Sequence, residues 1–448
     1  NEINQKVEIY IPDRKTEGYG PSITGFKKLI SQGSNLIFTV DCGTLSFDTI
    51  NFSQEKRTDV LVLDHHQSDL KLPNAFSIVN PNRYDDNSKL NYLCAAGVCF
   101  MFLVALNKKL RDINWFQNNN LKEPNLIDYL DLVSLGTVCD VVPLVGLNRA
   151  FVSQGLEIFK KKLNLGLKTL KNICGIETNL NTHHLGYVIG PRINAGGRVG
   201  RCAHGANLLL SKNSKEVFKI ASELETYNKE RKIMESDMLN KIENSINIDS
   251  KEPIILLSGH QWHGGIIGII ASRLKEKYNK PTIIISVDKG LGKASARSVV
   301  GFDIGTVIIS AVQNKILKKG GGHKMAGGFT IEVNKIEEFR SFIKKQFIKI
   351  QQALVKKNIL FYDAKLSPSA LNINFYSEIN SLSPFGSGNP EPRFVIEDLE
   401  LIKSSIVGDR HIKLLLSAKD GSVIKGVTFN AIKTNLEPYL LSKNRKKI

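Results

Sequence analysis

The chain has 448 residues, of which 42% are hydrophobic and 23% are charged, a balance typical of a globular protein with two or three domains. It contains no apolar run long enough to cross a membrane, and its polar start from Asn1 to Glu8 predicts no secretory signal. Lys and Arg outnumber Asp and Glu by 61 to 43, and the net charge of +18 indicates a polyanionic partner, although a lysine-rich composition could also give a bland basic surface.

The charge is unevenly distributed along the chain. Residues 1–150 contain 15 Lys and Arg against 17 Asp and Glu, whereas residues 251–350 contain 17 against 7. The first part is therefore suited to holding cations and the later part to holding phosphates.

Six scattered cysteines form no CxxC pair and lie at no zinc-ligand spacing. This pattern predicts reduced thiols in a cytoplasmic protein and no zinc site. The cysteines are Cys42, Cys94, Cys99, Cys139, Cys174 and Cys202.

Two short apolar runs, Leu36 to Val40 and Val60 to Leu63, are separated by a segment of helical length. They predict buried parallel strands of a βαβ unit. Asp41 follows the first run and Asp64 follows the second. Because functional clefts lie beyond the carboxyl ends of parallel strands, we expect both acids to face one cleft.

The middle of the chain predicts helices and a second α/β unit. Ala95 to Leu106 and Leu126 to Leu135 predict buried helices, and the polar stretch Ser211 to Asn247 predicts a long helix between domains. The second unit is expected to include a strand from Pro253, a helix from Gly264 to Leu274, a strand from Thr282 to Ser286, a glycine cluster near Lys319 and a helix from Ile336 to Gln351.

From about Asp363 the sequence changes to short segments separated by turn signals, which predicts a small all-β domain. Its expected strands are Phe394 to Ile396, Leu399 to Ile402, Ile412 to Ser417 and Val423 to Phe429.

The strongest chemical signal is Asp64-His65-His66 directly after a predicted strand. Carboxylates and neutral imidazoles suit Mn²⁺ or Mg²⁺ poised for hydrolysis. A His-His pair alone is more often structural, but a second strand-end acid, Asp41, reverses that expectation.

These residues belong to an ordered set of motifs. Leu63 to His66 resembles the motif that names the DHH phosphoesterase superfamily. The later motifs follow the order found in RecJ exonucleases, and the last two are specific to RecJ and its nearest relatives: Val79 to Arg83, Leu135 to Pro143, Gly190 to Arg198 and Gly320 to Gly328.

The resemblance implies a centre of Mn²⁺ or Mg²⁺, with two ions in the complete protein. Asp41, His65 and Asp140 are implied as metal ligands, with Asp64 completing or supporting the site. His66 is implied to face the scissile phosphate, so that Asp64, His65 and His66 form the catalytic set. Without the resemblance, Asp140 would be interpreted as an ordinary aspartate at a helix end.

The resemblance also implies a set of substrate-binding residues. One group holds the phosphates and the terminal 5′-phosphate, and another lines the path of the strand, although any one of the arginines could be only a surface charge. The first group is Arg14, Tyr19, Ser295, Arg297, Gly321, Gly322 and His323, and the second is Arg192, Asn194 and Arg198.

Other histidines and a tryptophan carry weaker signals. His260 and His263 lie in a stretch that resembles the structural start of the family's second domain, so we do not expect metal ligands there. His183 and His184 are expected to form a loop pair. Trp262 could stack on a base, but core packing is the preferred interpretation.

The expected fold is α/β. It consists of a parallel-sheet DHH domain (1–210), a connecting helix (211–250), a second α/β domain of DHHA1 type (251–355) and a β-barrel of OB-fold type (360–448). The Asp-x-Asp motif of the family, whose acids are also metal ligands, is not found here, and Val7 to Ile11 resembles the strand that follows it. We therefore expect a fragment that lacks that motif and the last strands of the barrel.

The first functional hypothesis is a metal-dependent exonuclease that degrades single-stranded DNA from its 5′ end to mononucleotides in recombination and repair. The alternative is a catalytically inactive nucleic-acid-binding subunit, and a small DHH enzyme acting on short oligonucleotides is disfavoured. The expected protein is a cytoplasmic monomer without membrane contact that cooperates with a helicase and a single-strand-binding protein.

Overall fold

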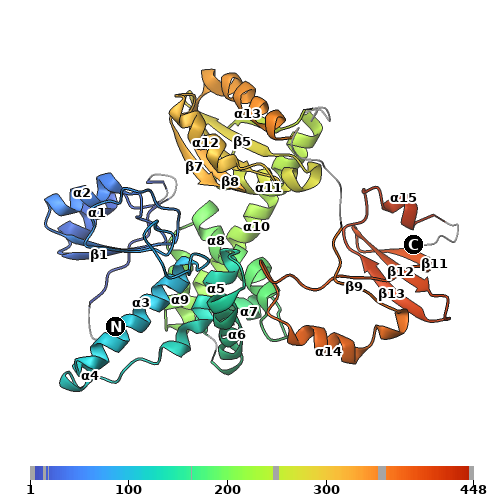
Figure 1. Cartoon of the computed structure of the whole chain (residues 1–448), viewed down its shortest axis with the longest axis horizontal. Helices are drawn as coiled ribbons and strands as arrows, with labels where there is room; N and C mark the ends of the chain where they lie inside the picture. Colours follow the sequence, from blue (N-terminus) through green and yellow to red (C-terminus); the bar gives the residue numbers. More distant parts are fainter. Residues whose placement is uncertain are drawn as a thin grey trace. The chain divides into compact units, whose positions relative to one another are not determined.

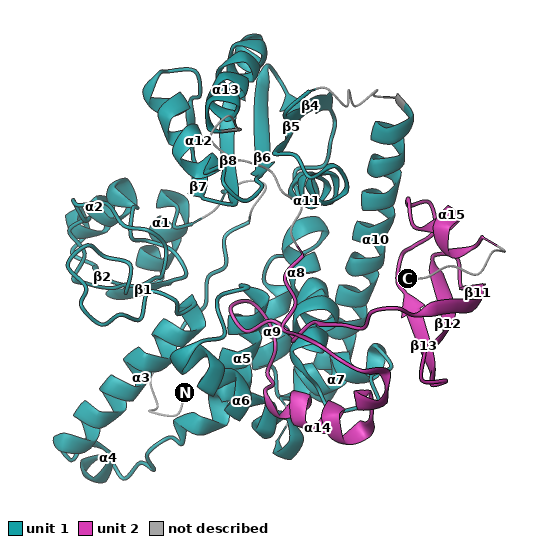
Figure 2. Cartoon of the chain, turned by 45° about the vertical axis from the view of Figure 1, so that its right-hand side comes forward, with its two compact units in different colours: residues 1–356 teal, residues 357–448 magenta. Residues whose placement is uncertain are grey.

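The computed structural model describes residues 6–13, 17–18, 20–162, 164–245, 252–351 and 360–442. The chain divides into two compact units, residues 1–356 and 357–448 (Figure 2). Among the described helices, none is both long and apolar enough to span a bilayer.

The first unit begins with a parallel sheet of three strands and two accompanying helices (Figure 1). In chain order these are α1 (Ile23–Ser31), β1 (Leu36–Val40), α2 (Phe47–Glu55), β2 (Asp59–Leu63) and β3 (Ser77–Val79). The predicted βαβ unit is confirmed, because β1 and β2 pair in parallel and α2 connects them. Phe26 of α1 and Ile50 of α2 lie in one apolar core with the strands, so both helices pack on the sheet.

The segment Val7 to Ile11, which the resemblance implies to be a strand, forms none. The Tyr10 ring packs against Gly25, where a Cβ would lie 2.6 Å from it. The Tyr10 hydroxyl donates to Glu17 at 2.8 Å, and Ser22, the N-cap of α1, donates to the same carboxylate. The prediction was wrong because these contacts hold the segment against the start of α1.

A group of helices follows the sheet. In chain order these elements are α3 (Ala95–Asp112), α4 (Trp115–Asn118), the 3-10 helix η1 (Leu126–Tyr129), α5 (Leu130–Cys139), α6 (Gly146–Lys161), α7 (Leu165–Ile173), the π-helix η2 (His184–Ile189), α8 (Gly190–Val199) and α9 (His204–Leu210). The helix predicted from Ala95 is confirmed. The helix predicted from Leu126 begins as a 3-10 turn, continues as α5 and places Asp140 at its C-cap.

The close approach of α5 and α6 depends on Gly155 of α6. A Cβ at this position would lie 1.8 Å from the Ser134 hydroxyl oxygen and 2.3 Å from the Leu130 carbonyl oxygen. Ser134 is buried and donates to that carbonyl at 2.7 Å. Since Asp140 is the C-cap residue of α5, this packing also helps to fix the position of its backbone.

The predicted connecting helix is α10 (Ser214–Ser245). Val217 and Leu224 pack in the apolar core of the preceding helices. Met238 and Ile242 pack with residues of α11 (Ile267–Tyr278). The helix therefore joins the two parts of the first unit through packed side chains as well as through its backbone.

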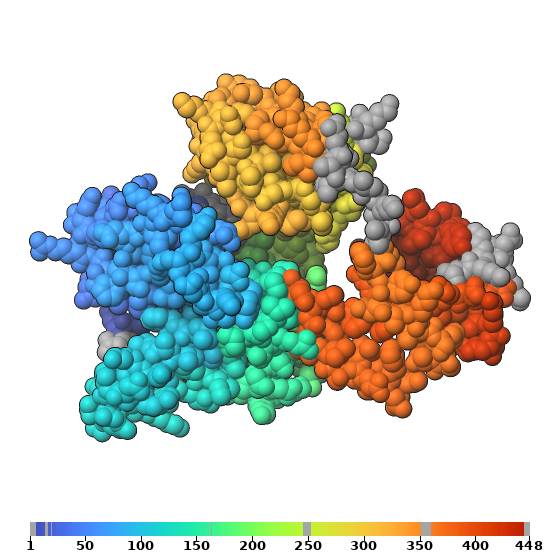
Figure 3. Space-filling model, in the orientation of Figure 1, coloured from blue at the N-terminus to red at the C-terminus, as the bar shows by residue number. Residues whose placement is uncertain are grey.

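The second sheet confirms the predicted second α/β unit. Its further elements are β4 (Ile255–His260), β5 (Thr282–Asp288), β6 (Leu291–Arg297), α12 (Ile304–Gln313), β7 (Lys319–His323), β8 (Ala326–Glu332), the 3-10 helix η3 (Val333–Lys335) and α13 (Ile336–Gln351). The strand order is β4-β5-β6-β8-β7, in which β4 and β5 are parallel and the other neighbours are antiparallel. These residues form one continuous body, yellow to orange in Figure 3.

The glycine run Gly320 to Gly322 lies in β7 and pairs with β8. A Cβ at Gly322 would lie 2.4 Å from the Ala326 carbonyl oxygen, and a Cβ at Gly305 of α12 would lie 2.8 Å from the Gly322 carbonyl oxygen. α12 therefore packs directly on the backbone of this hairpin. Gly321 differs, because a Cβ there would meet open space.

The second unit contains an antiparallel sheet in the order β11-β12-β13. Its elements are β9 (Ala364–Lys365), the 3-10 helix η4 (Pro368–Ala370), α14 (Ile373–Ser381), β10 (Phe394–Val395), β11 (Glu400–Val407), β12 (His411–Ser417), β13 (Val423–Thr428) and α15 (Glu437–Leu440). The four predicted strands are present, but the described residues 360–442 do not form a closed barrel.

The all-β prediction for this unit missed helix α14. The Asn372 side chain caps the helix by accepting from the Phe375 backbone N–H at 3.0 Å. Phe375 then packs edge-on against Phe394 with ring centroids 5.2 Å apart. The cap and this contact outweigh the turn signals that dominated the sequence.

We expect Gly155→Ala to lower the free energy of unfolding by about 1–3 kcal/mol, because the added methyl group would overpack the α5–α6 contact. Thermal and denaturant unfolding would measure the change. The control is Gly264→Ala, where a Cβ would meet nothing within 4 Å. Equal stability of the two variants would contradict this packing argument.

Candidate metal centre

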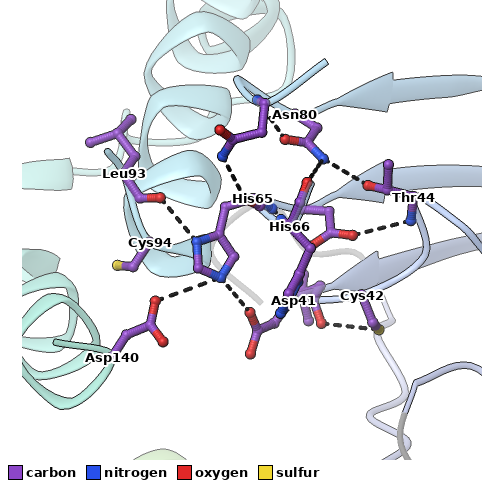
Figure 4. Close-up of polar contacts among 12 residues, drawn as sticks. Asp41, Cys42, Thr44, His65, His66, Asn80, Leu93, Cys94 and Asp140 are labelled. Atoms are coloured by element: carbon purple, nitrogen blue, oxygen red, sulfur yellow. Dashed lines mark hydrogen bonds and ion pairs between the residues drawn. The ribbon is translucent and has the colours of Figure 1, made fainter. Parts of the chain in front are cut away.

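Polar side chains follow the ends of the three neighbouring parallel strands. Asp41 follows β1, Asp64 follows β2 and Asn80 follows β3. The strand registers bring these ends to one level. Because parallel strands share their carboxyl ends, these side chains meet at one edge of the sheet, where Figure 4 shows Asp41 and Asn80.

His65 lies between two carboxylates at this edge. Its Nε2 is 3.2 Å from Asp41 Oδ1 and 3.5 Å from Asp140 Oδ2. On the other side of the ring, Nδ1 lies 3.1 Å from the Leu93 carbonyl oxygen, which can accept but not donate (Figure 4). Nδ1 therefore carries the proton in the neutral imidazole, and Nε2 presents its lone pair toward the carboxylates.

The electrostatics of the cluster follow from burial and close charges. Burial alone would lower the pKa of His65, but the hydrogen bond to Asp41 and the charges of Asp140 and Asp41 raise it above its ordinary value. Burial raises the pKa of Asp140, and repulsion by Asp41 adds to this. A bound cation would relieve the repulsion between the two carboxylates.

Asp64 is the buried support of the site. It is 1% exposed. Oδ1 accepts from the backbone N–H of His65 at 2.8 Å and from His66 Nδ1 at 2.8 Å, and Oδ2 accepts from the Thr44 N–H at 3.1 Å. Burial would raise its pKa, but the hydrogen bonds from His66 and Thr44 hold it well below its usual range. These contacts favour a supporting role for Asp64 over direct coordination.

The backbone beside the cluster is bent sharply. Asp41 has a φ of 63°, a left-handed conformation that costs energy for a residue with a side chain. Gly43 follows with a φ of 115°, and a Cβ there would lie 2.5 Å from the Thr39 hydroxyl oxygen. The turn after β1 thus directs the Asp41 carboxylate to His65. It also brings the backbone of Gly43 close to the Thr39 side chain of β1.

His66 faces a histidine from the second sheet. The rings of His66 and His323 are stacked, with centroids 5.9 Å apart and planes inclined by 21°. The hydrogen bond to Asp64 raises the pKa of His66 against the effect of burial. Burial and the charges of His66 and His65 lower the pKa of His323. One ligand atom from each of Asp41, His65 and His66 lies within 4.8 Å of the other two.

The sequence analysis named the motif Val79 to Arg83 but gave no role to its asparagines, which hold the Asp-His-His backbone. Asn80 is buried and donates to the His66 carbonyl oxygen and to Thr44 Oγ1, both at 2.8 Å. Asn82 donates to the His65 carbonyl oxygen at 2.6 Å. The position of Asn80 directly after β3 is the signal that could have identified it.

Ser295 and Arg297 lie on β6 of the second sheet. Arg297 Nη1 donates to Ser295 Oγ at 3.2 Å, so the two predicted residues are in direct contact. Gly321 and Gly322 lie next to His323 on β7, the edge strand that is separated from β6 by β8 alone. Ser295 of β6 and Gly321 of β7 both pair with Gly328 of β8.

The predicted strand-path residues lie together on α8. Arg192 donates to Glu225 at 2.5 Å and to the Val188 carbonyl oxygen at 2.9 Å. Asn194 and Arg198 line a cavity of about 650 Å³ between helices of the first unit. Arg14 and Tyr19 lie outside the described residues.

The remaining histidines have other surroundings. His183 stacks on Tyr187 with ring centroids 5.1 Å apart. His184 begins the π-helix η2 and His183 is its helical N-cap, so the pair does not lie in a loop as expected. Nδ1 of His263 accepts from the Gly265 N–H at 3.2 Å. Trp262 packs against an apolar core, which confirms the packing interpretation.

Three models of protein families match the chain. They are the DHH family N-terminal domain over residues 1–137, the DHHA1 domain over residues 251–349 and the RecJ OB domain over residues 362–447. The parallel sheet, the cluster at its strand ends and the second sheet thus define a protein of the DHH class.

The chain is 32% identical over 437 residues to the single-stranded-DNA-specific exonuclease RecJ of Dickeya dadantii (strain 3937), covering 95% of this chain and 76% of that protein. The crystal structure of RecJ in complex with Mn²⁺ from Thermus thermophilus matches with a TM-score of 0.74 and 26% identity, over 90% of this chain and 62% of that one. The Mg²⁺ complex from the same source matches with a TM-score of 0.68 and 26% identity, over 88% and 61%. The chain belongs to the RecJ family.

We expect Mn²⁺ to bind more tightly as the pH rises from about 6 to about 8, because His65 must lose its proton before Nε2 can bind a metal. In the metal-free protein, by contrast, His65 and His66 make the free energy of unfolding fall as the pH rises. The raised pKa values of His65 and His66 contribute stability that is present below the unfolded value of about 6.5 and lost as the pH rises through the folded values.

Calorimetric titration with Mn²⁺ and thermal unfolding in EDTA would measure the two dependences. The His183→Ala variant, altered outside the cluster, should retain both. A Mn²⁺ affinity that does not change with pH would contradict the assignment of His65 as a ligand.

Proposed function

We propose that this chain is a metal-dependent exonuclease that hydrolyses single-stranded DNA from its 5′ end to mononucleotides in recombination and repair. The observation that carries the proposal is the convergence of Asp41, His65 and Asp140 in a chain of the RecJ family. The stacked pair His66 and His323 adds nitrogen donors from two sheets beside this cluster.

The donor set fits Mn²⁺ or Mg²⁺. The site offers two carboxylates and the Nε2 of His65, which points toward them, and both kinds of ligand suit these ions. The Leu93 carbonyl fixes the tautomer of His65 that leaves Nε2 unprotonated. Asp41, His65 and Asp140 would hold the ion, with Asp64 supporting the site. When bound, such an ion lowers the pKa of a water molecule and neutralises charge on a phosphate.

The chain's own residues bind and orient the phosphate. Asp64 holds the His66 ring by its Nδ1, which directs the remaining nitrogen outward. The hydrogen bond to Asp64 raises the pKa of His66, and a protonated ring would donate to phosphate oxygens. His323 faces it, and the open backbone at Gly321 leaves room for a phosphate beside Gly322.

We assign the strand path and its 5′ end to the remaining predicted residues. Arg297 and Ser295, with Arg14 and Tyr19, grip the terminal phosphate, and the α8 residues line the path. Residues 251–350, with 17 Lys and Arg against 7 Asp and Glu, supply the positive potential that this role requires. The path residues on α8 are Arg192, Asn194 and Arg198.

We assign the strand-holding role to the C-terminal domain, from residue 360, because OB-folds hold single strands.

We retain the domain division 1–210, 211–250, 251–355 and 360–448, and we propose that the protein acts as a monomer in the cytoplasm. The six free cysteines support that compartment. A helicase and a single-strand-binding protein are the partners that would supply an unpaired end.

We expect His65→Ala to reduce cleavage roughly 100-fold or more, since even outer-shell partners of metal ligands are worth about 10–100-fold. Strand binding should remain, because the residues assigned to the strand path and the 5′ end on α8 and β6 are not altered. A 5′-labelled strand with Mn²⁺ would measure cleavage, and fluorescence anisotropy would measure binding.

His183→Ala provides the control for removal of an imidazole elsewhere. Parallel loss of binding and cleavage in His65→Ala would argue against this division of roles. Undiminished substrate with the unaltered protein, or equal digestion of a blunt duplex, would refute the proposed activity.

For Arg297→Ala we expect a weaker preference for a 5′-phosphorylated strand over a 5′-hydroxyl strand. The loss should be about tenfold or more, because a charge-assisted hydrogen bond to phosphate contributes about 1.5–3 kcal/mol. The ratio of affinities for the two strands is the measurement. Lys345→Ala, which removes an exposed charge from α13 of the same domain, is the control, and an unchanged ratio in Arg297→Ala would show that the assignment is wrong.

A further inference from the structure

Arg297 is held by a side chain of another element, Ser272 of α11. Arg297 Nε donates to the Ser272 hydroxyl oxygen at 3.1 Å, and that hydroxyl donates to the Gly268 carbonyl oxygen at 3.1 Å. On its own strand, Arg297 Nη1 donates to Ser295 Oγ at 3.2 Å and to the Ala296 carbonyl oxygen at 2.8 Å. The guanidinium is therefore fixed from a helix and from a strand.

The alternation of β6 directs these polar residues toward the helix. Ala294 and Ala296 are buried in the core on one face of the sheet. Ser295 and Arg297 therefore point to the opposite face, where α11 packs. Strand β6 thus has an apolar face, with Ala294 and Ala296 in the core, and a polar face, with the half-buried Ser295 and Arg297 directed to α11.

Gly268 allows the helix to approach this polar face. A Cβ at Gly268 would lie 3.0 Å from Ser295 Oγ and 3.2 Å from Arg297 Nη2. A larger residue would push the first turns of α11 away from β6. Gly268 and Ser272, one turn apart on α11, therefore act together: the first leaves space for the guanidinium and the second accepts from it.

We propose that Ser272 is a positioning residue that sets the orientation of Arg297 for recognition of a 5′-terminal phosphate. This inference rests on the proposed role of Arg297. A free arginine side chain loses considerable rotamer entropy when it binds, and a planar guanidinium recognises phosphate only in the correct plane. The bond from Nε to Ser272 fixes that plane before the strand arrives, so less freedom is lost on binding.

A purely structural role for Ser272 makes a different prediction. Serine often donates to the carbonyl four residues earlier in a helix, as Ser222 of α10 does to Phe218 at 2.9 Å. If Ser272 only anchored its helix, its loss would affect both kinds of strand end alike. If it positions Arg297, its loss affects only the phosphorylated end.

The test measures binding of the full chain to 5′-phosphorylated and 5′-hydroxyl strands of one sequence, by fluorescence anisotropy in EDTA. We expect Ser272→Ala to weaken binding of the phosphorylated strand about three- to tenfold, as for one lost hydrogen bond, and to leave the hydroxyl strand unchanged. Ser272→Thr, which keeps a hydroxyl, should restore the preference. Ser222→Ala is the matched control and should alter neither affinity.

A double-mutant cycle separates this inference from the proposed function. Ser272→Ala should add nothing in an Arg297→Ala background. If Arg297→Ala loses the preference but Ser272→Ala keeps it, or weakens both ends alike, the positioning role is overturned and the role of Arg297 stands. If Arg297→Ala keeps the preference, the proposed role of Arg297 fails and the inference fails with it. Unchanged thermal unfolding of each variant would exclude misfolding as the cause.

Discussion

The arrangement of the site depends on the position of the His65 ring between Asp41 and Asp140. Its Nε2 lies within 3.5 Å of a carboxylate oxygen on each side, while the Leu93 carbonyl holds its Nδ1. These four residues come from four segments of the chain. Strand register, helix packing and a backbone carbonyl must therefore all be correct before three ligand atoms meet, and a small shift of any segment would separate them.

The buried Asp64 explains how such a cluster is held firmly. A carboxylate that is 1% exposed would be costly without partners, but N–H groups of Thr44, His65 and His66 surround it. Its charge therefore organises the loop that carries both histidines, and Asn80 fixes the same loop from the next strand. The positions of His65 and His66 at the edge of the sheet thus depend on the buried charge of Asp64.

The second sheet supplies the opposite kind of surface. The first sheet ends in carboxylates, whereas the second presents His323 from β7 and Arg297 from β6. The division matches the uneven charge of the sequence, with an acidic first third and a basic later part. A cation and a polyanion can then be held side by side, because each is bound by the part of opposite charge. The packed helix α10 connects the two parts.

The sequence alone determined the parallel strands, the acids at their ends, the long connecting helix and the candidate ligands, because these depend on periodicity and on the shared carboxyl edge of a parallel sheet. Asp140 required the resemblance, since nothing local distinguishes it from an ordinary helix end. Only the tertiary structure could reveal the Leu93 carbonyl beside His65, the bond between Ser272 and Arg297, and the wrongly predicted strand from Val7 to Ile11. The physical reason is that the first two contacts join residues distant in the chain, and that side-chain packing of Tyr10 on α1 decides the conformation of the third segment, which no local pattern records.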